Sequence, residues 1–268
     1  MNRRDFVATT GLAGLAPMVV SGSSHENEKS AHVNNAAQQF FELRKYTSRV
    51  GPHKAKLAKF LENTAVPAWN RNGIAHVGVF NVMYGPNAPT TYVLLAHNSL
   101  ASVGMLREKL ASDKQYQTNG AEFLAATLAD PGYTRIESSL FKAFSGMPEV
   151  AVPAGAQENE PRIFELRIYE SHSEAAAIRK VEMFNNGEIP IFLDTGLTPV
   201  FFGEALIGEK LPNLTYMLTF KDMADRDESW SKFIVHPDWK KMSSDPYYKD
   251  TVSNITSIIL RPLPFSQL

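Results

Sequence analysis

One short pattern occurs twice in this chain, and this repetition limits the fold more than any other feature. FELRKY at 41–46 returns 123 positions later as FELRIY at 164–169. Other landmarks repeat at the same offset, or with one inserted residue: Val66-Pro67 with Ile189-Pro190, Gly73 with Gly196, and Thr91-Tyr92 with Thr215-Tyr216. A surface loop absorbs one inserted residue at little cost. The sequence therefore predicts one structural unit written twice.

A segment rich in proline and glycine separates the two copies. Residues 145–161 include Gly146, Pro148, Pro153, Gly155 and Pro161 and show little periodicity, which is typical of an inter-domain linker. We therefore predict a first domain over 39–145, a linker over 146–160 and a second domain over 161–268.

Hydrophobic periodicity predicts the same element order in each copy. Alternation over 41–46 and 164–169 indicates a first strand, and apolar residues at helical spacing follow until Pro67 and Pro190 close the helix. Two strands come next, over 75–83 and 92–96 in copy one and over 199–207 and 215–220 in copy two. A second helical region and a last strand, over 135–144 or 254–260, complete the unit.

This order, β-α-β-β-α-β, is that of a ferredoxin-like unit. Both helices of such a unit cover one face of its sheet and leave the other face bare. Two bare faces in one chain can cover each other. We expect an α+β fold in which two tandem ferredoxin-like repeats form a barrel-like pseudo-dimer with the helices outside.

The N-terminal residues 1–35 have the pattern of an export signal followed by a disordered leader. Arg3 and Arg4 precede a weakly apolar stretch over 6–20, which small residues follow. The arginine pair with Phe6 resembles the twin-arginine motif. The sequence predicts export to the periplasm or the cell exterior by that route. The apolar stretch is shorter than the ~20 residues that a membrane span needs, so we expect no stable span.

Composition excludes several classes of protein. The 27 Lys and Arg residues nearly balance 28 Asp and Glu, so no global positive charge favours a nucleic-acid partner. The absence of cysteine excludes disulfides, thiolate nucleophiles and cysteine-bound metals. No phosphate-binding glycine loop or serine-hydrolase elbow is present. We predict no cofactor and no metal site.

The doubled FELR-x-Y strand, the Val-Pro and Ile-Pro pairs with their following glycines, and the segment 226–239 together resemble the NIPSNAP family of the dimeric α/β-barrel superfamily. The resemblance covers both repeats. Copy one departs from it in its second helix, where the Trp and Pro landmarks are missing. The family implies a two-domain barrel in one chain and no settled reaction, metal or substrate.

Polar side chains on the first strand of each copy are the candidate ligand-binding residues. If Leu43 and Leu166 face the helices, alternation points the intervening side chains into the barrel. The residues on this face are Glu42, Arg44, Tyr46, Glu165, Arg167 and Tyr169. Buried charges need partners, so these groups either pair as a structural network or bind a ligand.

His76 joins these candidates because it falls inside a predicted strand and matches Pro199 in copy two. A lone strand histidine is commonly a hydrogen-bonded core residue, and proton transfer or ligand binding is the alternative. Because only copy one has this histidine, we expect a ligand to lie nearer copy one.

Two classes of function remain open. The first is an exported barrel protein that binds a small organic ligand or a protein partner, with a homo-oligomer also compatible with the sequence. The second is a cofactor-free monooxygenase, isomerase or haem-handling enzyme, by analogy with other branches of the superfamily. The sequence leaves open whether the protein is an enzyme.

Overall fold

The computed structural model describes residues 37–268, apart from 86–87, 157 and 159. The predicted export signal and leader, residues 1–35, lie outside the described residues. Within the described part of the chain, no helix is long and apolar enough to cross a membrane.

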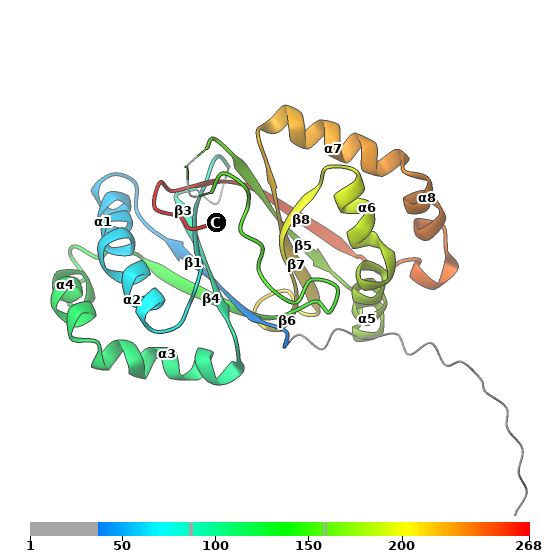
Figure 1. The fold of residues 1–268 in the computed structure, drawn as a ribbon. Helices are drawn as coiled ribbons and strands as arrows, with labels where there is room; N and C mark the ends of the chain where they lie inside the picture. The colour runs from blue at the N-terminus through cyan, green and yellow to red at the C-terminus, as the bar shows by residue number, and fades with distance from the viewer. Residues whose placement is uncertain (1–36, 86–87, 157, 159) are drawn as a thin grey trace, which may run out of the picture. The chain divides into compact units, whose positions relative to one another are not determined.

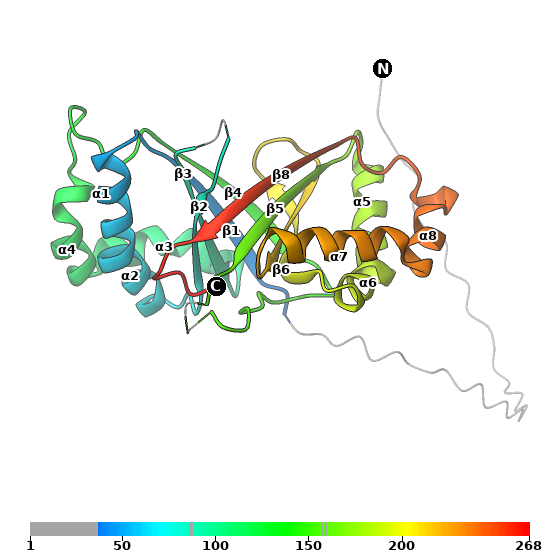
Figure 2. The same cartoon turned by 90° about the horizontal axis from the view of Figure 1, so that it is seen from above.

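The strands form one closed antiparallel barrel in the order β1-β3-β2-β8-β5-β7-β6-β4, with β4 pairing again with β1 (Figures 1 and 2). Copy one supplies β1 (Phe40–Thr47), β2 (Val77–Val82), β3 (Thr90–His97) and β4 (Arg135–Ala143). Copy two supplies β5 (Ile163–Glu170), β6 (Thr198–Ile207), β7 (Asn213–Phe220) and β8 (Asn254–Pro262). The copies join where β2 pairs with β8 and β4 pairs with β6. The predicted α+β barrel of two ferredoxin-like repeats is confirmed.

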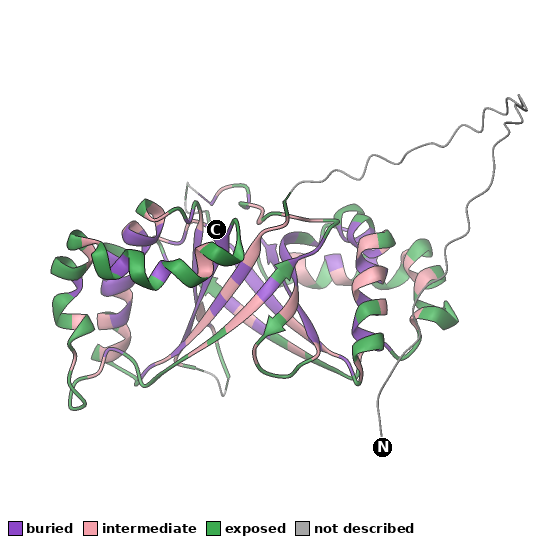
Figure 3. Ribbon diagram, turned by 90° about the horizontal axis from the view of Figure 1, so that it is seen from below, coloured by how far each residue is buried: buried purple, intermediate pink, exposed green. Residues whose placement is uncertain are grey.

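The helices lie outside the barrel in two groups, one against each copy's strands (Figure 1). The first group is α1 (Pro52–Phe60), η1 (Leu61–Ala65), α2 (Val66–Arg71), α3 (Leu100–Ser112) and α4 (Lys114–Leu124). The second is α5 (Glu174–Met183), η2 (Phe184–Glu188), α6 (Ile189–Asp194), α7 (Met223–Val235), α8 (Pro237–Ser243) and η3 (Pro246–Tyr248). In Figure 3 these helices carry buried as well as exposed residues, as amphipathic helices on a sheet do.

Pro67 and Pro190 do not close the first helices, contrary to the sequence prediction. Each lies in the first turn of a further helix, α2 or α6, which follows a π-helical segment. A proline lacks the N–H that an α-helix interior requires, but the first turn of a helix leaves that group unpaired in any case. The chain therefore continues past both prolines.

Strand pairing also corrects the proposed alignment of the two copies. Opposite Lys45 on β1 lies Tyr92, whereas the residue opposite Ile168 on β5 is Thr215. Tyr92 is thus equivalent to Thr215, at the original offset and without an inserted residue. Tyr216 faces the opposite side of the sheet from Tyr92.

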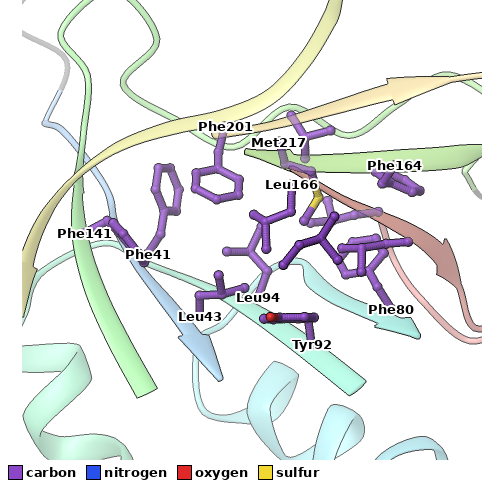
Figure 4. Packing of buried hydrophobic residues seen from close by; sticks show 14 of the residues in the cluster. Phe41, Leu43, Phe80, Tyr92, Leu94, Phe141, Phe164, Leu166, Phe201 and Met217 are labelled. Atoms are coloured by element: carbon purple, nitrogen blue, oxygen red, sulfur yellow. The ribbon is translucent and has the colours of Figure 1, made fainter. Parts of the chain in front are cut away.

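The barrel interior is a packed hydrophobic core (Figure 4), and its composition reverses the predicted facing of the first strands. Leu43 and Leu166 point into this core, together with Phe41, Phe80 and Phe164. Period-two alternation then turns the polar residues of β1 and β5 outward, toward the helices. The direction was wrong because both faces of these strands are buried, and alternation alone does not say which face lies in the barrel core.

Candidate functional site

The outward polar residues of copy one form a compact network between β1 and its helices. Arg44 donates two hydrogen bonds to Glu42, from Nε to Oε1 at 2.7 Å and from Nη2 to Oε2 at 2.9 Å. Ser138 Oγ on β4 donates to the same carboxylate at 2.9 Å. His97 Nε2 lies 3.5 Å from Glu42 Oε2, and its Nδ1 lies 3.0 Å from Ser102 Oγ.

Copy two builds a denser network around Glu165, which is fully buried. Arg167 Nη1 donates to Oε1 at 2.8 Å, and Arg226 on α7 donates to both oxygens at 2.9 and 2.7 Å. Trp230 Nε1 and Ser257 Oγ donate to the carboxylate at 2.8 and 2.6 Å. Five donors thus surround the two carboxylate oxygens, as a buried ion network requires.

The carboxyl groups of Glu42 and Glu165 both have a lowered pKa in the folded protein. Burial alone would raise the pKa of Glu42, but the His97 imidazole and the Arg44 guanidinium outweigh burial and lower the pKa to about 2. Burial likewise opposes ionisation of Glu165, and Arg226 with Ser257 lowers its pKa to about 2. Both groups are therefore charged at neutral pH.

The predicted site residues consequently do not meet in the barrel interior. Glu42, Arg44 and Tyr46 lie under one helical group, and their copy-two equivalents Glu165, Arg167 and Tyr169 lie under the other. Tyr46 packs in the core between β1 and α1, while Tyr169 accepts hydrogen bonds from Arg167 and Tyr216. Each first strand does have a polar face, but that face lies between the sheet and the helices of its own copy.

His76 is likewise not where the sequence prediction placed it. It precedes β2, is half-buried, and makes no side-chain hydrogen bond within the described residues. The histidine beside the Glu42 carboxylate is His97, fully buried at the end of β3. Among the described residues, no group of three His, Asp or Glu side chains could hold a metal ion.

A cavity of about 380 Å³ opens at one end of the barrel. Its lining comes from the ends of β1, β3, β4, β5, β7 and β8 and from the β6–β7 hairpin over 208–210. Leu43, Phe141 and Ile258 provide an apolar floor shared with the barrel core. We call this cavity the mouth.

The two copies contribute chemically different walls to the mouth. Strand pairing makes Lys45 equivalent to Ile168, Tyr92 to Thr215, Glu137 to Thr256 and Ser139 to Ile258. All eight of these residues line the mouth. At these four strand positions copy one supplies the ionisable side chains and copy two the more apolar ones, while Glu209 and Lys210 of copy two add charge from the hairpin, so the duplication produces an asymmetric site.

Charged side chains of the mouth are mostly paired. Lys45 Nζ lies 3.0 Å from Glu137 Oε2, and Lys210 Nζ lies 3.3 Å from Glu170 Oε1 and 3.0 Å from Thr256 Oγ1. Lys210 belongs to the hairpin and has a φ of 60°, a conformation that non-glycine residues seldom adopt. Its contacts tie the hairpin to the rim of the mouth.

The mouth residues were missed because the sequence offers only a weak sign of them. Lys45 breaks the match between FELRKY and FELRIY, and this difference marks the wall where the copies diverge. The difference between Tyr92 and its equivalent Thr215 was missed because the sequence alignment paired Tyr92 with Tyr216. Glu137 was missed because its strand carries no repeated motif.

A closed barrel of two ferredoxin-like repeats, with a helical layer on each repeat, defines the dimeric α/β-barrel class, here made by one chain. The sequence pattern of the NIPSNAP family matches residues 41–130 and 164–267. The chain belongs to the NIPSNAP family.

Two solved structures share this fold over most of the chain. A protein from Lactobacillus acidophilus, provisionally named a monooxygenase, has 10% identity and a TM-score of 0.55, over 84% of this chain and 94% of that one. A similarly named protein from Fusobacterium nucleatum has 9% identity and a TM-score of 0.53, over 85% and 93%. A NIPSNAP-like domain protein from Burkholderia xenovorans has 20% identity and a TM-score of 0.37, over 40% and 90%. No curated protein matches this chain.

Proposed function

We propose that this NIPSNAP protein binds a small organic molecule in the mouth of its barrel. The observation that supports this is the cavity of about 380 Å³ at the end of a barrel that is otherwise filled by side chains. Ligand sites in proteins are typically apolar concavities of ~300–1,000 Å³ with a few polar groups. The mouth has this size, and it combines an apolar floor with a largely polar rim.

The two walls define how such a molecule would lie. Its apolar body would pack on Leu43, Ile168 and Ile258, where burial of apolar surface supplies most of the binding free energy. Its polar group would face the copy-one wall with Lys45 and Tyr92. Binding thus needs both copies of the repeat.

The test uses the uncharged fluorescent probe N-phenyl-1-naphthylamine, whose emission rises in apolar surroundings. Wild-type protein should bind it saturably. Ile168→Trp fills part of the mouth with an indole ring and should weaken binding of the probe at least tenfold. Ile255→Trp is the matched control, because Ile255 is 47% exposed and does not line the mouth. Equal affinity in both variants, or no binding to the wild type, would contradict the proposal.

A further inference from the structure

Tyr92 presents to the mouth a hydroxyl that forms no hydrogen bond with the described residues of the protein. The residue is only 6% exposed and lines the cavity. Its hydroxyl oxygen makes no hydrogen bond within residues 37–268 as described, yet it is not sealed from the cavity. Because the hydroxyl is accessible from the cavity, an acceptor atom of a ligand can take the place of solvent there and gain the net affinity of one hydrogen bond.

The hydroxyl is a donor at any physiological pH. Burial, together with the nearby carboxylates of Glu137 and Glu209, raises the pKa of Tyr92 to about 12. The phenol therefore keeps its proton and can donate it to an acceptor oxygen of a ligand. Lys45, on the adjacent strand opposite Tyr92, is a second donor on the same wall.

Charge balance narrows the ligand class. The ionisable side chains that line the mouth include two cations, Lys45 and Lys210, and two anions, Glu137 and Glu209. Lys45 is already paired with Glu137 at 3.0 Å. An anionic ligand would therefore gain no net attraction and would approach two carboxylates, while an uncharged acceptor avoids that repulsion.

We propose that the ligand is an uncharged carbonyl compound whose oxygen accepts a hydrogen bond from the Tyr92 hydroxyl while its apolar body packs on Ile168 and Ile258. This inference rests on the proposed function, since it names the class of molecule that the mouth takes. Tyr92 then determines specificity, because an analogue without an acceptor leaves its hydroxyl unpaired.

The experiment measures the affinities of two proteins, the wild type and Tyr92→Phe, for two fluorescent probes. The probes are 6-propionyl-2-(dimethylamino)naphthalene, which carries a ketone, and 2-(dimethylamino)naphthalene, which lacks it. In Tyr92→Phe the ring stays and the hydroxyl is lost, so affinity for the ketone should fall about tenfold, the worth of one hydrogen bond, with no change for the parent amine. Tyr116→Phe is the control, because Tyr116 is half-buried on α4 and does not line the mouth.

The outcomes separate this inference from the proposed function. If neither probe binds the wild type, the proposed function itself is wrong. If both bind and Tyr92→Phe weakens them equally or not at all, the mouth binds ligands but the carbonyl assignment is wrong. Tighter binding of the anionic probe 8-anilinonaphthalene-1-sulfonate than of the ketone would also overturn the assignment and would point to an anionic ligand.

Discussion

Glu42 and Glu165 occupy equivalent positions on β1 and β5 but depend on different partners. Glu165 has two arginines, Arg167 and Arg226, whereas Glu42 has one, Arg44. Position 103 of copy one, equivalent by sequence offset to Arg226, is a valine. A symmetric repeat thus carries an asymmetric charge network, and single substitutions should reveal the difference.

Arg44→Met should destabilise the protein more than Arg167→Met. Removing Arg44 leaves the mostly buried Glu42 without a permanent positive charge, at a cost of about 3 kcal/mol. Removing Arg167 leaves Arg226 on both oxygens of Glu165, so the cost should be about 1–2 kcal/mol from the lost hydrogen bonds and the contact with Trp230. Urea unfolding at neutral pH measures both. Equal losses would show that Arg226 does not compensate.

The same carboxylates make the free energy of unfolding depend on pH in the acid range. The folded pKa of Glu42 is about 2 against an ordinary 4.5, so its contribution is complete above the ordinary value and is lost as pH falls toward 2. This shift corresponds to about 3 kcal/mol. Glu42→Gln should therefore lower the unfolding free energy at neutral pH and flatten its decline in acid. An unchanged slope between pH 4.5 and about pH 2 would contradict the assignment.

At the scale of elements, the α5–η2 segment carries a buried ion pair that copy one does without. Lys180 Nζ lies 2.7 Å from Glu188 Oε2, and both side chains are almost fully buried. At the same sequence offset copy one has Leu57 and Ala65, both fully buried. An apolar pair therefore fits this place in the fold.

Glu188→Ala alone should cost about 3–5 kcal/mol, because it leaves the Lys180 ammonium buried without a counter-charge. The double variant Lys180→Leu/Glu188→Ala should recover most of that loss, since it removes both charges. Thermal and urea unfolding of the single and double variants give the coupling energy. If the double variant is as unstable as the single one, the pair contributes more than mutual neutralisation.

Strands were predictable from the sequence, and their facing was not. Short alternating runs bounded by turn residues placed each strand of the barrel, with ends that shift by a few residues. The facing of Glu42 and Leu43 could not be obtained this way, because both sides of β1 are buried, one by the barrel core and one by the helices. The helix end predicted at Pro67 was wrong because the π-helical segment before this proline has no local sequence signal.

At the scale of the whole molecule, barrel closure by both copies was predictable and the mouth was not. The bare sheet face of each repeat follows from element order alone. The chemistry of the mouth is set by equivalent positions at which the two copies carry different residues, such as Lys45 and Ile168. These equivalences follow from the strand register, which the sequence alone does not give. The predicted site residues on β1 and β5 lie instead between the sheet and the two helical groups.

The barrel also predicts how half of the molecule behaves. Residues 39–145 alone would expose the core face with Phe41, Phe80 and Leu94, which copy two covers in the whole chain. Such a surface drives association, so the half should be insoluble or should dimerise with a second copy in place of the missing half. Size-exclusion chromatography with light scattering measures this. A stable monomeric half would show that the repeats fold independently.

Methyl NMR of isoleucine-labelled protein, titrated with N-phenyl-1-naphthylamine, tests ligand binding in the mouth most directly. Ile168 and Ile258 line the mouth, whereas Ile136 on β4 and Ile255 on β8 lie at the same end of the barrel but are exposed on its outer face. We predict saturable shifts of the Ile168 and Ile258 methyl signals and none at Ile136 or Ile255. Shifts confined to the outer pair, or no shift at saturating probe, would contradict a ligand site in the mouth of the barrel.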